Sequence, residues 1–233
     1  MEQTVVYSNR PEERAGTHLV LMLHGYGSNE RDLMQIGSLI GGPFTYAGMR
    51  APQPVGTPLA EVHDSAVIPG TAFGYQWFPL TYTLESNLRT VELASDFVID
   101  FLNREASHYE TVTLLGFSQG MAMATSVARC RPELVQSIVG LSGFVIPDES
   151  EYFHDEEFSA RRIPVFYGRG DADPIISTER SAHATQWLSE HSKVELHVYP
   201  GMAHSINPQE IEHVAQFLRS QVLSSTENNS VNN

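Results

Sequence analysis

Five apolar runs alternate along the chain with segments of helical spacing, and this alternation limits the fold more than any other feature of the sequence. The runs cover residues 17–23, 111–117, 135–141, 163–167 and 194–199. Most of them are continuously apolar, which is typical of parallel strands that are covered by helices on both faces. We therefore expect an α/β fold with a mostly parallel central sheet, right-handed crossovers and helices on both faces.

Helical patterns fill the intervals between these runs. An apolar stripe at helical spacing extends from Leu88 to Leu102, after a candidate N-cap at Ser86 or Asn87. Further helices are predicted at residues 119–130, 178–191 and 208–222. The first of these is rich in Ala and Met, so we expect it to be buried.

No internal repeat or shift in composition marks a second domain. The 233 residues are 41% hydrophobic, enough for a sizeable core. We expect one domain over residues 1–223, without a separate cap domain, and a polar, disordered tail over residues 224–233. Residues 50–84 are rich in Pro and Gly and predict a loop, and the acidic segment 147–158 predicts a solvated surface loop.

Charge and cysteine content exclude several classes of protein. Fourteen Lys and Arg residues stand against 28 Asp and Glu residues, a net charge of −14. Such a chain is a poor ligand for nucleic acid or for an anionic bilayer, and we expect neither partner. Cys130 is the one cysteine, so no internal disulfide can form. With no secretory pattern and no long apolar stretch, we expect no membrane insertion and a cytoplasmic location.

The segment Gly116-Phe117-Ser118-Gln119-Gly120 fits the pattern G-x-S-x-G between a predicted buried strand and a predicted buried helix. A sharp turn there holds the Ser118 hydroxyl outside the carboxyl end of the strand, beside the unpaired N–H groups of a helix N-terminus. A solvated serine in a plain turn is the alternative. We expect Ser118 to be a nucleophile.

A serine hydroxyl is a weak nucleophile and needs a general base. His204 follows the last predicted strand, and two candidate acids, Asp171 and Asp173, follow the strand before it. The order serine, aspartate, histidine is that of an α/β-hydrolase triad, with all three at one edge of the sheet. Asp173 is the preferred acid, because Pro174 biases it toward an extended backbone, whereas Asp171 is more suited to stabilising the glycine-rich turn.

Two backbone N–H groups are expected to form an oxyanion hole. One belongs to Gln119, the residue after the nucleophile, and the other to Tyr26, in the glycine-rich segment that follows the first long strand. His24 in the same segment is expected to be a packed, hydrogen-bonded histidine and not a catalyst.

These motifs, together with Leu23-His24-Gly25-Tyr26-Gly27 and Gly201-Met202-Ala203-His204, resemble the carboxylesterase/phospholipase family that includes the acyl-protein thioesterases. The resemblance spans about residues 17–220 and implies the α/β-hydrolase fold. It also implies Ser118, Asp173 and His204 as the triad, with Tyr26 and Gln119 as oxyanion donors. Met121 departs from the pattern, because the family usually has a second glycine there. Homodimers are common in the family, so a homodimer is among the expected assemblies.

Trp77 and Phe78 resemble a Trp-Phe pair in the substrate-side loop of that family. Because their segment is loop-like and apolar, we expect them to line an acyl groove and bind substrate, with packing in the core as the alternative. Cys130 is expected to be a small packed side chain. No histidine spacing or glycine loop indicates a metal ion or a nucleotide, so no cofactor is expected.

The function expected from these residues is that of a serine hydrolase. It would cleave small carboxylic esters or thioesters of short to medium acyl chains through an acyl-enzyme on Ser118. An amidase or lactonase on the same triad is one alternative. A non-catalytic binding protein on the same fold is another, although the intact order of the three residues argues against it.

Overall fold

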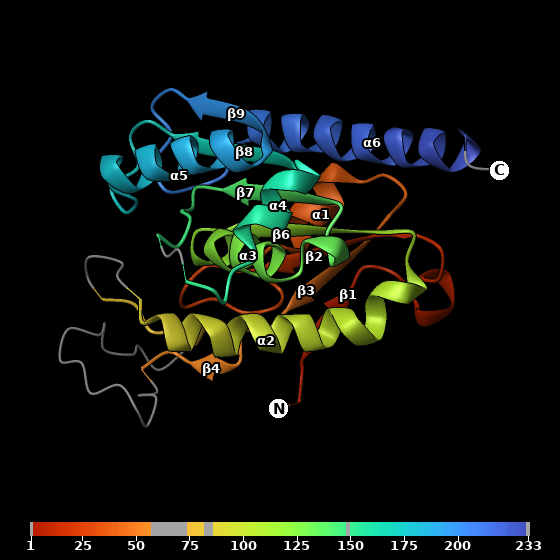
Figure 1. The fold of residues 1–233 in the computed structure, drawn as a ribbon, viewed down its shortest axis with the longest axis horizontal. Helices are drawn as coiled ribbons and strands as arrows, with labels where there is room; N and C mark the ends of the chain where they lie inside the picture. The colour runs from red at the N-terminus through yellow and green to blue at the C-terminus, as the bar shows by residue number, and fades with distance from the viewer. Residues whose placement is uncertain (1, 57–73, 82–85, 148–149, 232–233) are drawn as a thin grey trace.

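The computed structural model describes residues 2–56, 74–81, 86–147 and 150–231, and its centre is a seven-stranded sheet (Figure 1). The strand order is β1-β3-β2-β6-β7-β8-β9. These strands are β1 Val5–Tyr7, β2 His18–Leu23, β3 Phe44–Met49, β6 Thr111–Phe117, β7 Ser137–Leu141, β8 Pro164–Gly170 and β9 Lys193–Tyr199. Only β1 pairs antiparallel with its neighbour in this sheet, so the expected mostly parallel α/β architecture is confirmed.

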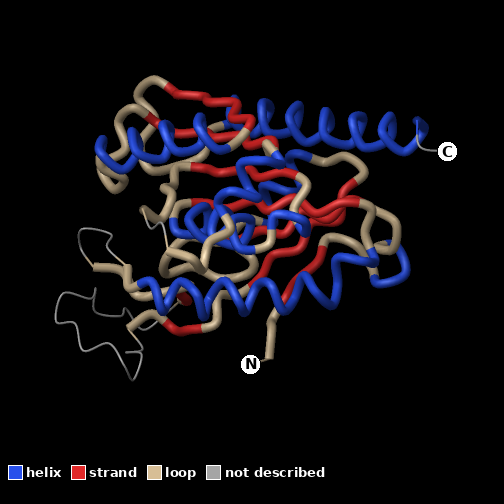
Figure 2. Tube along the Cα trace, viewed as in Figure 1, coloured by secondary structure: helices blue, strands red, loops and turns tan. Residues whose placement is uncertain are grey.

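Helices cover both faces of this sheet (Figures 1 and 2). They are α1 Met34–Ile40, α2 Leu88–Glu105, α3 Gln119–Cys130, α4 Asp155–Arg161, α5 Thr178–His191 and α6 Pro208–Val231. Helices α2 to α5 contribute to one buried cluster, whereas α1 and α6 contribute to a second. Within the described ranges, no helix combines the length and the hydrophobicity that crossing a bilayer requires.

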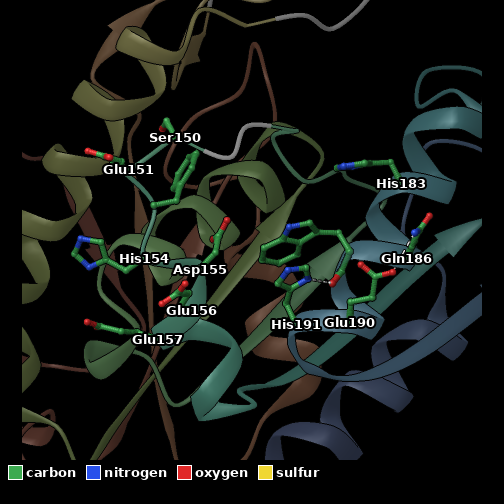
Figure 3. Close-up of a pocket in the computed structure, with 12 residues that line it drawn as sticks. Ser150, Glu151, His154, Asp155, Glu156, Glu157, His183, Gln186, Glu190 and His191 are labelled. Atoms are coloured by element: carbon green, nitrogen blue, oxygen red, sulfur yellow. Dashed lines mark hydrogen bonds between the residues drawn. The ribbon is translucent and has the colours of Figure 1, made fainter.

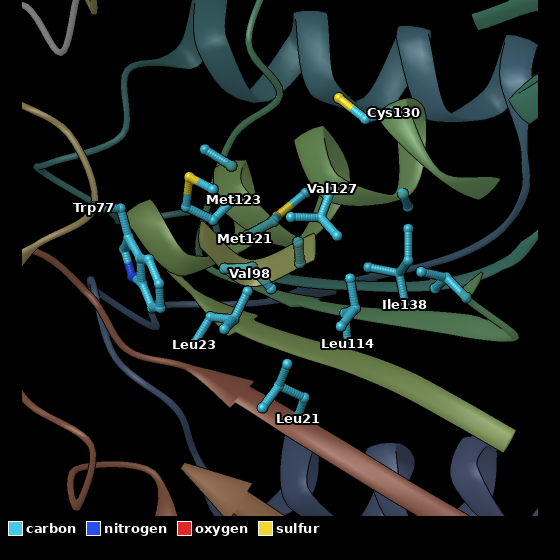
Figure 4. Close-up of a cluster of buried hydrophobic side chains, with 14 of the residues drawn as sticks. Leu21, Leu23, Trp77, Val98, Leu114, Met121, Met123, Val127, Cys130 and Ile138 are labelled. Atoms are coloured by element: carbon cyan, nitrogen blue, oxygen red, sulfur yellow. The ribbon is translucent and has the colours of Figure 1, made fainter. Parts of the chain in front are cut away.

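Strand β2 shows why the apolar runs are continuous. Leu21 and Leu23 belong to the cluster under α2 and α3, and Val20 and Met22 belong to the cluster under α1 and α6. All four side chains are at most 1% exposed. Figure 4 shows the first cluster, in which residues from β2, β6 and α3 interdigitate. Because both faces are covered, a polar residue on either face would lose its water, and the strand is apolar throughout.

The predicted strand 111–117 and the predicted helices 119–130 and 178–191 have the bounds that the structure shows. Strand β3 is an element that sequence reasoning missed. Its six residues are all buried, but Gly48 interrupts the β-forming pattern. A Cβ at Gly48 would collide with the backbone carbonyl of Glu30, so a close approach of another segment requires the glycine.

Two polar segments differ in part from the expected loops. Helix α6 continues from Pro208 to Val231, so the helix includes residues 224–231 of the expected tail. The acidic segment is not only a solvated loop, since α4 begins within it. Asp155 there forms a bidentate ion pair with the fully buried Arg129, at 2.7 Å for each bond. Asp148 and Glu149 lie outside the described residues.

The segment expected as a loop over residues 50–84 is only partly described, because residues 57–73 and 82–84 lie outside the described ranges. The described parts contain two short strands, β4 Gln53–Pro54 and β5 Tyr75–Gln76, which pair antiparallel. Tyr75 of β5 also forms an isolated bridge with Ser28, in the loop after β2. This pairing brings the segment that carries Trp77 and Phe78 against the carboxyl end of the sheet.

Candidate active site

Three side chains meet at the carboxyl edge of the parallel strands. Ser118 follows β6, Asp173 follows β8 and His204 follows β9. The Nε2 atom of His204 lies 2.9 Å from Ser118 Oγ, and its Nδ1 atom lies 2.8 Å from Asp173 Oδ2. The Asp173 side chain is 5% exposed and that of His204 is 18% exposed. The imidazole therefore connects a nearly buried carboxylate to a partly exposed hydroxyl.

The backbone at Ser118 is strained, and the glycines on either side of it make the sharp turn possible. Ser118 has φ 55° and ψ −117°, a backbone conformation that residues other than glycine rarely adopt. A Cβ at Gly116 would collide with the Gly120 carbonyl, and one at Gly120 would collide with the Leu23 carbonyl. The two glycines of G-x-S-x-G therefore let the chain turn sharply, so that the hydroxyl lies at the sheet edge.

The two candidate aspartates have different partners. Asp173 Oδ1 accepts hydrogen bonds from the N–H groups of Ile175 and Ile176, which leaves Oδ2 for His204. Asp171 Oδ1 instead accepts the N–H of Gly201 at 2.6 Å and ties two loops together. The structure thus places Asp173, and not Asp171, against the imidazole.

The segments of the two expected oxyanion donors lie on either side of Ser118. Gln119 is the first residue of α3, where N–H groups have no intrahelical acceptor and the helix dipole favours negative charge. A Cβ on Gly25, next to Tyr26, would lie 3.5 Å from Ser118 Cβ, so this loop passes close to the nucleophile. His24 is 1% exposed, and burial lowers its pKa. It is a packed histidine, as expected.

Trp77 and Phe78 are both fully buried members of the main hydrophobic cluster. Figure 4 shows the Trp77 ring at one end of that cluster, near Leu23. Neither side chain presents surface to a substrate in this structure. The burial agrees with the alternative that the pair is core and corrects the expectation of a groove wall, since apolar rings in a loop lose more water contact by packing inward.

The departure at Met121 is accommodated by two glycines elsewhere. A Cβ at Gly140 would meet Met121 Sδ at 2.6 Å, and a Cβ at Gly143 would lie against the same side chain. Met121 is fully buried. The Met121 side chain therefore fits into the space that the glycines of β7 and of the turn after it leave free. The turn at Ser118 keeps its geometry.

The turn after β7 contains a residue that sequence reasoning missed. Ser142 has φ 45°, is 1% exposed and donates its hydroxyl hydrogen to the carbonyl of Ser205, 3.1 Å away. The preceding residue, Leu141, accepts the N–H of Ser118 at 2.9 Å. The turn thus joins the serine elbow to the histidine loop. A serine after an apolar strand carries no signal that could have revealed this link.

Glu210, in the first turn of α6, was also missed. It is fully buried, and among the described residues neither of its carboxylate oxygens has a hydrogen-bond partner. Its side chain occupies the space that a Cβ on Gly168 would need. Burial raises the pKa of Glu210 to about 8. Burial of the carboxyl group therefore favours its neutral form.

Other candidate groups lie apart from the three central residues. A cavity of about 830 Å³ between α4 and α5 is lined by acids, histidines and two aromatic rings (Figure 3), and contains none of the three. Its lining residues are Ser150, Glu151, Phe153, His154, Asp155, Glu156, Glu157, His183, Gln186, Trp187, Glu190 and His191. Cys130 is buried, which raises the pKa of its thiol to about 12, so it is a packed side chain. In the described part of the chain, no cluster of His, Cys, Asp and Glu has the arrangement of a metal site.

A strained serine elbow, a parallel sheet and an Asp-His-Ser arrangement at its carboxyl edge define the class of α/β-hydrolase folds. The model of the phospholipase/carboxylesterase family matches residues 2–222, and the chain belongs to that family. The solved structure of esterase PE8 is similar, with a TM-score of 0.74 and 26% sequence identity over 94% of this chain and 99% of that one.

Acyl-protein thioesterases are among the similar sequences. Acyl-protein thioesterase 1 of Saccharomyces cerevisiae is 33% identical over 118 residues, which are 49% of this chain and 52% of that protein. The chain therefore spans about half the length of this relative. The protein of the same name from Mycosarcoma maydis is 24% identical over 217 residues, which are 87% of this chain and 90% of that protein.

Proposed function

We propose that the protein is a serine hydrolase that cleaves carboxylic esters or thioesters through an acyl-enzyme on Ser118. The observation that carries the proposal is the hydrogen-bonded chain from Ser118 through His204 to Asp173, with distances of 2.9 and 2.8 Å. Relatives named as acyl-protein thioesterases and carboxylesterases support the same class of reaction.

In this mechanism, His204 Nε2 accepts the Ser118 hydroxyl proton as Oγ attacks the acyl carbonyl carbon. The carbonyl electron pair moves to oxygen, and the resulting oxyanion accepts hydrogen bonds from the backbone N–H groups of Tyr26 and Gln119. When the intermediate collapses, the bond to the leaving group breaks and His204 gives its proton to the leaving oxygen or sulfur. Water then attacks the acyl-enzyme, with His204 again as the base.

Asp173 orients the imidazole in this scheme. Its Oδ1 atom is held by two backbone N–H groups, so Oδ2 keeps a fixed direction toward His204 Nδ1. A carboxylate there favours the tautomer with the proton on Nδ1 and stabilises the imidazolium that forms when Ser118 loses its proton. The low exposure of Asp173 limits competition by water for that contact.

The substrate is proposed to be a small ester or thioester with a short to medium acyl chain. Each further CH₂ that the site buries adds at most ~0.8 kcal/mol, which is about a threefold to fourfold gain in kcat/KM. We expect kcat/KM to rise along a series of p-nitrophenyl acyl esters and then to level off at a medium chain length. Matching acyl thioesters run in parallel identify the preferred leaving group.

The decisive test of the proposal compares the wild type with Ser118→Ala. A fluorophosphonate should label the wild type covalently and leave Ser118→Ala unlabelled. Ester turnover should fall by about 10⁴-fold or more, because only the oxyanion donors and substrate binding remain. Labelling that persists in the variant would place the nucleophile elsewhere and overturn the proposal.

A further inference from the structure

Trp77 makes hydrogen bonds in two directions from a fully buried position. Its backbone N–H donates to the side-chain Oε1 of Gln119 at 3.1 Å, and its indole Nε1–H donates to the backbone carbonyl of His24 at 2.9 Å. Its ring also packs against the His24 imidazole, with ring centroids 5.5 Å apart. One residue is therefore bonded both to the first residue of α3 and to the loop after β2.

The neighbours of Trp77 strengthen both connections. The Gln119 side chain, fully buried, donates its Nε2–H to the carbonyl of Phe78 at 2.6 Å, so its amide group binds the backbone of two successive residues, Trp77 and Phe78. On the other side, Gly27 N–H donates to the Tyr75 carbonyl, and Tyr75 N–H donates to the Ser28 carbonyl. We call residues 75–78 the strap. It lies against both loops that border Ser118.

The loop after β2 is held in turn by His24. Its Nε2 atom accepts the N–H of Ala51 at 3.1 Å, so the ring proton is on Nδ1, which donates to the carbonyl of Gly25 at 2.8 Å. Gly25 directly precedes Tyr26. The His24 carbonyl that accepts the indole hydrogen bond therefore belongs to the peptide unit just before the one that contains the Tyr26 N–H.

We propose that Trp77 is a positioning residue, which sets the distance between the N–H groups of Tyr26 and Gln119 and so shapes the oxyanion hole. This inference rests on the proposed function and deepens it. Strands β2 and β6 pair up to Leu23 and Gly116, and beyond that point the sheet no longer fixes the two loops relative to each other. Just past that point, Trp77 binds the loop after β2 through His24 and the start of α3 through Gln119. The N–H groups of Tyr26 and Gln119 are about 90 residues apart in sequence. They can bind one oxyanion together only if the distance between them is fixed before the reaction.

This role also explains the burial of the ring. A groove wall would expose one face of the indole to substrate, whereas Trp77 is 0% exposed and its N–H is already bonded to protein. Both buried N–H groups of Trp77 need acceptors, and those acceptors lie on the two segments that flank Ser118. A positioning role depends on the indole N–H group, whereas packing depends on the ring volume. The two roles can be distinguished, because the N–H can be removed while most of the ring volume stays.

The test uses Trp77→Phe and a second variant with β-(3-benzothienyl)alanine at position 77, which keeps the bicyclic shape and replaces the N–H by sulfur. Each is assayed on an oxoester and on the matching thionoester, in which sulfur replaces the carbonyl oxygen. A well-shaped oxyanion hole favours the smaller oxygen anion, which is also the stronger hydrogen-bond acceptor. We expect kcat on the oxoester to fall about tenfold to hundredfold, less than the loss of a whole donor. The oxoester-to-thionoester ratio should fall about tenfold, with little change in KM.

Trp187→Phe, at the other tryptophan of the chain, is the matched control and should leave the ratio unchanged. Equal losses on both substrates in the two position-77 variants would show that Trp77 only stabilises the fold, and unchanged kinetics would show that the indole bond does not matter. Either result overturns the inference. Fluorophosphonate labelling of Ser118 in every variant is read separately, so a failure of the proposed function is distinguishable from a failure of this inference.

Discussion

Two carboxyl groups lie near the carboxyl end of β8, and their surroundings differ sharply. Asp173 accepts two backbone N–H bonds at Oδ1 and contacts His204 at Oδ2, so both of its oxygen atoms have a hydrogen-bond partner. Glu210 is buried against Gly168, and no described residue donates a hydrogen bond to it. The comparison shows that burial favours the neutral form of Glu210, whereas converging donors fix the direction in which the Asp173 side chain faces its neighbour.

The largest effect is expected from Asp173→Asn. An amide cannot stabilise an imidazolium and favours the wrong tautomer of His204, so kcat should fall by about 10⁴-fold while the fold is retained. Steady-state kinetics on a p-nitrophenyl ester and a thermal melt measure the two quantities.

Asp171→Asn is the matched control for that variant. Its carboxylate holds the Gly201 N–H, so the variant should have a lower Tm and nearly normal kcat. If Asp171→Asn lost more activity than Asp173→Asn, the assignment of the orienting acid would be wrong.

A smaller effect on turnover is expected from Ser142→Gly. Glycine adopts φ 45° without strain, so the substitution removes the hydrogen bond to Ser205 while relieving the backbone. The loop that carries His204 should loosen, and kcat should fall by about tenfold with KM little changed. The control is Ser137→Ala, at a buried serine on β7, the strand before that turn, which bonds to Thr113 instead. An unchanged kcat in Ser142→Gly would show that this link does not hold the histidine.

Glu210→Gln should change stability and not turnover. Because the pKa of Glu210 is raised to about 8 in the folded protein from about 4.5 in the unfolded chain, the folded state binds an extra proton between these values. Wild-type stability therefore falls as pH rises from about 4.5 to about 8. The variant lacks this loss, so its advantage in free energy of unfolding should grow across that window, to a few kcal/mol.

Denaturant melts of the wild type and Glu210→Gln at pH 5, 6.5 and 8 measure this difference. Glu212→Gln, at an exposed position two residues further along α6, should follow the wild type at every pH. A constant difference between Glu210→Gln and the wild type would show that Glu210 is charged in the folded protein, and the contrast with Asp173 would disappear.

The smallest expected effect is that of metal removal. In the proposed mechanism, the chain itself supplies the nucleophile, the base, the orienting acid and the oxyanion donors. Treatment with EDTA followed by gel filtration should leave ester hydrolysis unchanged. A large loss that a divalent ion restores would contradict the mechanism.

Much of the fold and of the candidate site was predictable because it is encoded locally. The continuous apolar run 111–117 predicted a strand covered on both faces, and β6 has those bounds. Pro174 favoured Asp173 over Asp171, and the structure places Asp173 against His204. In each case the determining residues are neighbours in the chain, so the pattern is visible without knowing the packing. Strand β3 was missed because the segment that requires Gly48 is brought there by the fold.

The amino-acid order alone was enough to place Ser118, Asp173 and His204 at the ends of three strands of one parallel sheet, since parallel strands share one carboxyl edge. It was not enough to show what Trp77 does. Whether an aromatic ring in a loop walls a groove or is buried depends on which segments pack over it. The bonds from Trp77 to His24 and Gln119 join groups that are 53 and 42 residues away in sequence. Hydrogen bonds over such distances depend on the relative positions of folded elements, and no local pattern of residue types specifies them.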